Sequence, residues 1–300
     1  MINELWAILP EYFEHMQAML RGESPSPVVR GHGEGEIVAV TKPGPKSGRV
    51  AQISITGTIM RRYSIWSEFG GASVETTLAM LRNVAADPDV KTVLLNIDSP
   101  GGTVDGLPEL AAEIRTLRES KHIVALANSL AASAAYWLAA QADEVVATPE
   151  ALVGSIGVFT AHMDYSALME RMGIKTTYIH AGKYKVEANP DEPLTDEARG
   201  HLQGIVDEAY GLFVNDVAKG RGVSAATVRS DFGEGRVLTA KDAKAAGLID
   251  RIAGYHETVA RLTGIKAEEP SPVGEGGGEG FTVGNSLAAK RLRLELLEKS

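Results

Sequence analysis

The fold class is decided by the stretch Val93-Leu94-Leu95-Asn96-Ile97-Asp98-Ser99-Pro100-Gly101-Gly102. Its first half is a mostly apolar run, which is typical of a strand covered on both faces of a sheet. A glycine-rich turn over 98–102 follows directly, and a helical pattern occupies about 104–120. Glycines at such a turn let backbone N–H groups face a ligand without obstruction by side chains. The stretch therefore predicts a strand, a candidate binding turn and a crossover helix.

The same alternation continues on both sides of this stretch. Further strands are predicted over 50–55, 122–127, 145–147, 156–159 and 176–180. Helices are predicted between them over 73–86, 131–141 and 165–172, and after Pro193 over 195–219, 224–231 and 240–246. Strands that alternate with helices indicate βαβ units, so we expect an α/β fold with a largely parallel sheet.

The chain divides into three predicted parts. Residues 1–48 hold an amphipathic helix over 2–20, which Pro10 starts or interrupts, and then a flexible arm rich in Gly and Pro. Residues 49–265 form the predicted α/β domain. Residues 266–300 begin as a linker rich in Gly, Glu and Pro and end in a short charged helix over 287–297.

Composition excludes several classes of protein. A net charge of −9 over 300 residues lacks the basic footprint that nucleic-acid binding needs. The absence of cysteine excludes disulfides and thiolate catalysis. No run reaches the roughly 18–20 apolar residues that span a bilayer, and the acidic N-terminus does not resemble a secretory signal. We therefore expect a cytoplasmic protein without a membrane anchor.

Ser133 is the candidate nucleophile. It lies between two alanines on each side, where a strand is predicted to turn into a helix. Small neighbours let a substrate backbone approach, and N–H groups at a helix start face a developing oxyanion. The alternative is a serine that caps or packs within a contact of small residues.

Lys185 and Ser155 are candidate partners of this serine. Lys183 and Lys185 are two residues apart and point the same way in extended chain, so one of them can lie inward and lose its charge by desolvation. Ser155, in Val153-Gly154-Ser155-Ile156-Gly157, can hold a lysine amine by a hydrogen bond. The alternatives are solvated loop lysines and an ordinary turn serine.

Other chemistries are less favoured by the spacing. His122, His162 and His180 lie within the predicted domain. His162-Met163-Asp164 has no spacing that pairs it with Ser133, whereas His180 ends a predicted strand that can approach the cleft, so a Ser–His mechanism is the less favoured alternative. The chain has no His-Glu-x-x-His motif and no Gly-x-Gly-x-x-Gly motif. We therefore predict neither a metal nor another cofactor.

Four motifs in order resemble the signal peptide peptidase A family of serine peptidases. They are Asp98-Ser99-Pro100-Gly101-Gly102, Ser129-Leu130-Ala131-Ala132-Ser133 with Tyr136, Gly154-Ser155-Ile156-Gly157-Val158, and Gly182-Lys183-Tyr184-Lys185. The resemblance covers about residues 49–260. It implies a serine endopeptidase with a Ser–Lys dyad, in which Ser133 is the nucleophile, Lys185 the general base and Ser155 the residue that orients the lysine.

The resemblance also assigns the oxyanion donors and the fold. Gly101 and Gly102 would supply backbone N–H groups together with Ala134. The implied fold is the Clp protease/crotonase type, built from repeated ββα units, and the implied assembly is a homo-oligomeric ring. One departure is Ala134-Ala135, where the family usually has Gly-Gly. The two methyl groups narrow the cleft or alter substrate choice.

A start of the form Trp-x-Ile-x-Pro at Trp6 and a charged tail resemble the phage and prophage branch of the family. That branch implies protein substrates, namely capsid or scaffold proteins, and action in the host cytoplasm or the procapsid. Three alternatives stay open: a cellular peptidase that degrades signal peptides, a crotonase-like acyl-CoA enzyme, and a catalytically inactive assembly subunit.

Overall fold

A central sheet carries the fold in the computed structural model, which describes residues 4–20, 38–39, 49–62 and 71–264. Its main path is β11-β10-β8-β6-β3-β2, with β9 beside β8 and β12 beside β9. The pairs β3/β6, β6/β8, β8/β9, β8/β10 and β9/β12 are parallel, so the predicted α/β class with a largely parallel sheet is confirmed. The strands are β2 (Val38–Ala39), β3 (Arg49–Thr56), β6 (Val90–Ser99), β8 (His122–Ala132), β9 (Glu144–Ala147), β10 (Leu152–Gly154), β11 (Val237–Thr239) and β12 (Arg251–Ile252).

A smaller sheet lies at the carboxyl end of β6. Its order is β1-β7-β4-β5, and its strands are β1 (Trp6–Ile8), β4 (Ile59–Met60), β5 (Ala72–Ser73) and β7 (Gly101–Thr103). Strand β7 follows β6 after Pro100, so the predicted glycine-rich turn is the corner between the two sheets.

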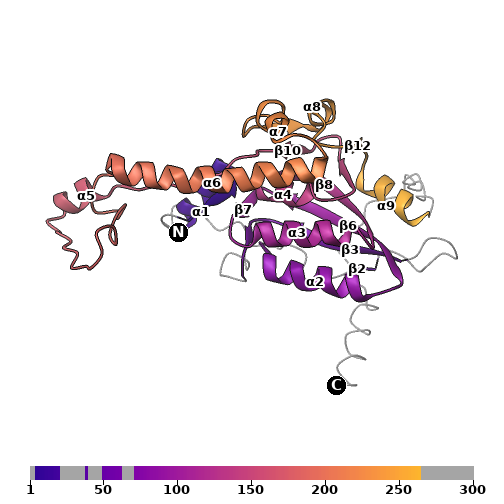
Figure 1. Ribbon diagram of the computed structural model, residues 1–300, viewed down its shortest axis with the longest axis horizontal. Helices are drawn as coiled ribbons and strands as arrows, with labels where there is room; N and C mark the ends of the chain where they lie inside the picture. Colours follow the sequence, from indigo (N-terminus) through magenta and orange to yellow (C-terminus); the bar gives the residue numbers. More distant parts are fainter. Residues whose placement is uncertain (1–3, 21–37, 40–48, 63–70, 265–300) are drawn as a thin grey trace, which may run out of the picture. The chain divides into compact units, whose positions relative to one another are not determined.

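Helices cover both faces of the central sheet (Figure 1). One face carries the main hydrophobic core under α2, α3, α4 and α6, and the other packs against α9. Val93 and Leu95 of β6 lie in the first cluster and Leu94 in the second, which explains the mostly apolar run in the sequence. The helices are α1 (Pro10–Leu20), α2 (Val74–Ala86), α3 (Leu107–Leu117), α4 (Ala134–Ala139), α5 (Ser166–Arg171), α6 (Asp196–Arg221), α7 (Ala225–Asp231), α8 (Ala240–Ala246) and α9 (Tyr255–Thr263).

A buried polar contact joins the long helix α6 to the short helix α4. The Trp137 ring stacks on Phe213 with centroids 4.4 Å apart, and its Nε1–H donates to Asp216 at 3.0 Å. Arg115 of α3 pairs with the same carboxylate at 3.1 Å. Because Asp216 has both a cationic and a neutral donor, the burial of its charge is compensated.

The N-terminal helix predicted over 2–20 is correct only in its second half. Residues 6–8 form strand β1, and α1 begins at Pro10. The apolar residues do recur at helical spacing, but β1 gains a ladder with β7 nearly 100 residues later in the chain. This long-range pairing overrides the local pattern.

Three other predicted elements differ from the structure. β8 extends to Ala132, so the helix expected from 131 begins only at Ala134. The strand expected over 156–159 is an isolated bridge at Phe159, and no strand forms over 176–180. Both segments lie where the chain leaves the central sheet, and among these described residues only Phe159 pairs with a neighbouring strand, through its bridge to Trp6.

The predictions for residues 21–48 and 266–300 fall mostly outside the described residues. Within the flexible segment predicted before residue 49, Val38 and Ala39 pair with β3 as strand β2. The predicted linker and helix over 266–300 lie outside the described part of the chain.

Candidate active site

Ser133 lies at the point where β8 ends and α4 begins. Its backbone angles are φ 56° and ψ −118°, a conformation that costs energy for any residue with a Cβ atom. The Ser133 N–H donates to Gly154 O at 2.7 Å, and its Oγ lies 3.4 Å from Gly157 O. Only 1% of the residue is exposed. A strained serine at a sharp strand-to-helix turn is the arrangement of a nucleophile elbow.

The residues beside this serine, Gly101 and then Gly102, are glycines because no side chain fits there. A Cβ atom at Gly101, where φ is +104°, would lie 3.0 Å from Ser133 Cβ. A Cβ atom at Gly102 would lie 1.8 Å from Ile59 O. The backbone of β7 therefore approaches the candidate nucleophile as closely as glycine permits.

Ser155 and Ala134 complete the group that the structure brings together. Ala132 and Gly154 are register partners in β8 and β10, which places Ser155 next to the elbow. Ser155 is buried, has φ 52°, and donates its N–H to Arg236 O at 2.8 Å. Ala134 is the first residue of α4, and both Ala134 and Ala135 are fully buried in the main core.

Lys185 is not part of this group within a single chain. It lies on a segment of residues 161–195, which we call the arm, and its side chain is exposed. All residues of the arm are described, and none is buried. Figure 1 shows α5 and the loop after it at the end of α6 away from the central sheet. The inward-facing lysine expected from the sequence is therefore not formed by one chain alone.

The two lysines of the arm differ in their contacts. Lys183 donates to Tyr184 Oη at 2.6 Å and to Glu197 at 3.3 Å, and these hydrogen bonds raise its pKa. Among the described residues, the Lys185 ammonium has no hydrogen-bond or ion-pair partner. Lys183 is thus held in its charged form, whereas Lys185 is available for another contact.

The histidines and the nearby tyrosine do not offer another base. His162 contacts Asn189 O at 3.0 Å and His180 contacts Gly182 O at 3.1 Å, both on the arm. His122 is at the opposite end of β8 from Ser133. Burial raises the pKa of Tyr136, and its hydroxyl donates to Leu248 O at 2.8 Å, so it stays protonated.

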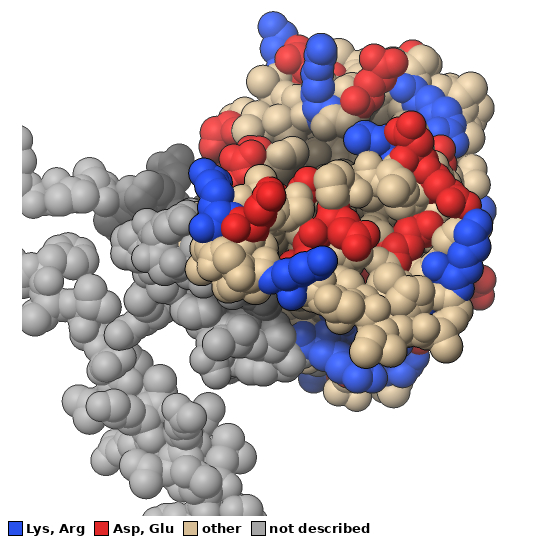
Figure 2. Space-filling model, turned by 90° about the vertical axis from the view of Figure 1, so that its left-hand side faces the viewer, with Lys and Arg blue, Asp and Glu red and all other residues tan. Residues whose placement is uncertain are grey.

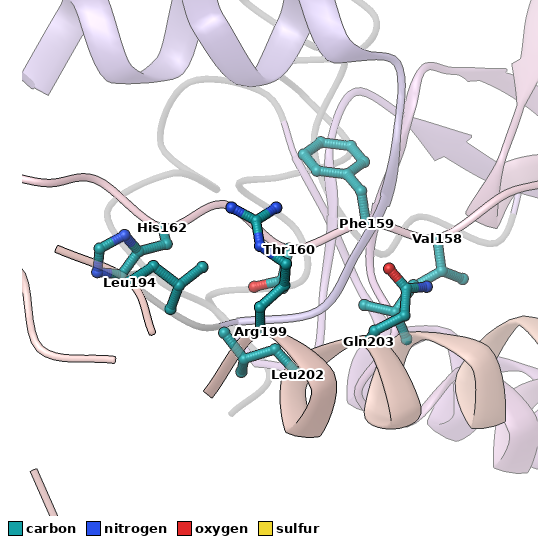
Figure 3. A pocket seen from close by; sticks show the side chains of 9 residues that line it. Val158, Phe159, Thr160, His162, Leu194, Arg199, Leu202 and Gln203 are labelled. Carbon is teal, nitrogen blue, oxygen red and sulfur yellow. The ribbon is translucent and has the colours of Figure 1, made fainter. Parts of the chain in front are cut away.

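Two features near Ser133 were not predicted from the sequence. Strand β1 lies along β7, and Phe159 bridges to Trp6 on its other side. A cavity of about 290 Å³ adjoins Phe159 (Figure 3). It is lined by Val158, Phe159, Thr160, His162, Leu194, Arg199, Leu202, Gln203 and Val206. The Trp-x-Ile-x-Pro motif was the available signal for strand β1, but the helical spacing of the apolar residues around it predicted a helix instead.

Across the described residues, no helix is both long and apolar enough to cross a bilayer. The face seen from the arm end carries acidic side chains near its middle and basic ones around them (Figure 2).

Comparisons with known proteins agree with this geometry. The model of a family described as Peptidase family S49 matches residues 115–268. A Methanocaldococcus jannaschii protein whose name calls it a protease is 37% identical over 61% of this chain and 58% of its own length. Capsid assembly protease C of Escherichia phage lambda is 33% identical over 72% of this chain and 51% of its own length. A signal peptide peptidase homologue from Enterococcus faecium is 30% identical over 79% of this chain and 69% of its own length. The chain thus spans little more than half the length of the first two relatives.

Proposed function

Because the chain belongs to peptidase family S49, we propose that it is a serine endopeptidase in which Ser133 is the nucleophile and Lys185 the general base. The observation that carries the proposal is the strained backbone of Ser133 directly beside the glycines of β7. Such strain persists where the surrounding structure enforces it, and it is concentrated at functional sites. The same family assignment favours a peptidase over the acyl-CoA enzyme considered above.

The reaction divides into two half-reactions around one acyl-enzyme. Lys185, in its neutral form, takes the proton from Ser133 Oγ, and the oxygen attacks the scissile carbonyl carbon. The C–N bond breaks, and the amine leaves with a proton returned by the lysine. Water then loses a proton to Lys185 and attacks the acyl carbon, the ester bond to Ser133 Oγ breaks, and Lys185 returns the proton to Oγ.

Backbone N–H groups of Gly102 and Ala134 would hold the oxyanion, with Gly101 shaping the approach. Both donors belong to residues next to Ser133, one on β7 and one at the start of α4. In other proteases one such donor contributes roughly 3–4 kcal/mol to the transition state. Ser155 would orient the Lys185 amine, since it lies beside the elbow in a buried turn.

We propose that Lys185 reaches a serine when copies of the chain assemble into a ring. The arm exposes large apolar side chains, including Ile179 at 98% and Met172 at 62%. Exposed apolar surface of this kind marks an interface. Closing that interface would desolvate the lysine and favour its neutral form.

The proposed substrates are unfolded or extended segments of proteins. The similarity to a relative named capsid assembly protease supports a role in processing scaffold or capsid proteins, in the host cytoplasm or the procapsid. The similarity to a signal peptide peptidase homologue supports the cellular alternative. The predicted division at residues 48 and 265 belongs to the same proposal.

The first prediction concerns the dyad. Wild type is expected to cut an unfolded protein, whereas Ser133→Ala and Lys185→Ala lose at least about a thousandfold in rate. Lys183→Ala is the matched control, because its ammonium is paired outside the site, and it should keep most of the activity. The intact masses of the products report the cleavage activity of wild type and of the three variants.

Mixing the two inactive variants tests where the base comes from. If Lys185 acts on Ser133 of another copy, an equal mixture allowed to reassemble recovers about a quarter of the wild-type activity. A silent mixture would place both residues in one chain. Cleavage by Ser133→Ala at the wild-type rate would refute the proposed function.

A further inference from the structure

Strand β1 lies between two edges beside the candidate active site. On one edge it runs antiparallel to β7, with Trp6 opposite Thr103, Ala7 opposite Gly102 and Ile8 opposite Gly101. On the other edge, Trp6 exchanges both backbone hydrogen bonds with Phe159, at 2.8 and 2.9 Å. We call the space between β7 and residues 158–160 the slot. Strand β1 fills it as a middle strand.

One peptide bond of β1 lies at Ser133. A Cβ atom placed on Gly101 would be 2.1 Å from Ala7 O, 3.0 Å from Ile8 Cα and 3.0 Å from Ser133 Cβ. The Ala7–Ile8 bond and the nucleophile therefore face the same point in space.

The register between β1 and β7 also places a proposed oxyanion donor, the Gly102 N–H, opposite this peptide bond. Leu9 N donates to Pro100 O at 3.0 Å, and Val104 N donates to Leu5 O at 3.1 Å. Hydrogen-bonded pairs alternate every two residues in an antiparallel ladder, so Ala7 and Gly102 form the pair between these two. The Gly102 N–H thus faces the Ala7 carbonyl. A peptide substrate bound as an added strand would have the same arrangement.

The side chains of β1 are largely separate from the main core. Trp6 and Ile8 form a small cluster with Phe13 and Met16 of α1, against which Phe159 packs. The Trp6 Nε1–H is buried and has no acceptor among the described residues. A buried unpaired donor weakens the packing that contains it. Leaving the slot would therefore cost β1 and α1 this small cluster and, from the main core, the contacts of Ala7 and Leu5.

We propose that residues 5–9 are a built-in competing ligand of the slot, which a peptide substrate must displace before Ser133 can act. The proposal rests on the proposed function, because it takes the slot as the substrate site. The segment itself stays uncut, because Ser133 Oγ points toward Gly157 O rather than toward the Ala7 carbonyl carbon. The occupant keeps the site closed until a substrate in sufficient concentration replaces it.

The test variant is Ala7→Pro in the full chain. Proline removes the N–H that pairs with Gly102 and its ring clashes with the facing strand, so β1 should leave the slot. We expect kcat/KM for an unstructured peptide to rise at least about tenfold, through a lower KM at unchanged kcat. Glu11→Pro is the control, because the first turn of a helix tolerates proline, and it should leave KM unchanged.

Binding without catalysis provides a second readout. In a Ser133→Ala background, a labelled peptide with the sequence of residues 3–11 is expected to bind the Ala7→Pro chain at least about tenfold more tightly than the chain with Ala7. The same peptide with proline in place of Ala7 should not bind. Phe13→Leu is a milder opening variant on the side of the occupant, since it weakens the contact of the Phe13 ring with Trp6, whose centroids are 5.2 Å apart. This variant should raise kcat/KM by less than Ala7→Pro does, and it serves as the second test if Ala7→Pro fails to fold.

The outcomes separate the two proposals. If the Ala7→Pro chain binds the peptide more tightly, but neither wild type nor any variant cuts a substrate, the competing ligand is supported and the proposed protease function is refuted. Cleavage with the same KM in wild type, Ala7→Pro and Phe13→Leu, all folded, would refute the competing ligand alone. Loss of residues 1–7 from wild type, but not from Ser133→Ala, would also overturn it, because the segment would then be a substrate.

Discussion

Ser133 has a backbone conformation that suits glycine better than serine. Its φ of 56° with ψ of −118° lies outside the regions that residues with a Cβ atom normally occupy. The serine is therefore present at a cost in stability, which supports the proposal that its hydroxyl takes part in the chemistry.

Replacing this serine should separate stability from activity. Ser133→Gly relieves the strain, although glycine adds freedom to the unfolded chain, and the net gain over Ser133→Ala is expected to be about 1 kcal/mol. Thermal unfolding should therefore give a higher Tm for Ser133→Gly than for Ser133→Ala, with both variants inactive. Equal Tm values would show that the turn is not strained.

At the scale of elements, helix α4, which begins directly after Ser133, is positioned by the long helix α6. Near its C-terminal end, α6 approaches the end of α4 so closely that a Cβ atom at Gly220 would lie 2.1 Å from Ala140 O. Trp137 and Asp216 join the same two helices through a hydrogen bond. The elbow therefore depends on α6 as well as on the central sheet.

A pair of glycine substitutions tests this dependence. Gly220→Ala should lower the free energy of unfolding by about 2 kcal/mol, because the methyl group meets backbone that cannot yield. Gly211→Ala, in the same helix with no atom within 4 Å of the added Cβ, should raise it by about 0.5–1 kcal/mol. Urea unfolding measures both. A destabilised Gly211→Ala chain would mean that this face of α6 is packed against another copy.

At the scale of the whole molecule, ion pairs fasten the C-terminal elements to the sheet. Asp250 accepts hydrogen bonds from Arg221 at 2.8 Å and from Val145 N–H at 2.8 Å. Burial by itself raises the pKa of Asp250, but these hydrogen bonds and the Arg221 charge outweigh it and lower the pKa below its ordinary value. The ionised carboxylate is thus favoured in the folded chain.

The sign of the pKa shift sets the expected pH dependence. A lowered carboxyl pKa stabilises the fold above the ordinary aspartate range, and this contribution is lost as pH falls through the lowered value. Asp250→Asn should therefore reduce Tm most at neutral pH, and the difference should shrink below about pH 4. Glu208→Gln, at an exposed carboxylate without an ion pair among the described residues, should follow wild type throughout. A difference for Asp250→Asn that is constant with pH would refute the argument.

The sequence by itself predicted the order of strands and helices around the elbow, because an apolar run, a glycine turn and small residues at a strand-to-helix turn are local features. The grouping of Ser133 with Ser155 and the glycines of β7 was expected from the family resemblance, and in the structure it depends on tertiary pairing such as the register of β8 with β10. Within one chain, only the tertiary structure decided that residues 6–8 form a strand and that Lys185 lies exposed on the arm. Strand β1 exists because β7 and Phe159 supply its backbone partners, and no local pattern encodes partners so distant in the chain. The position of Lys185 likewise depends on what covers the arm, which a single chain does not provide.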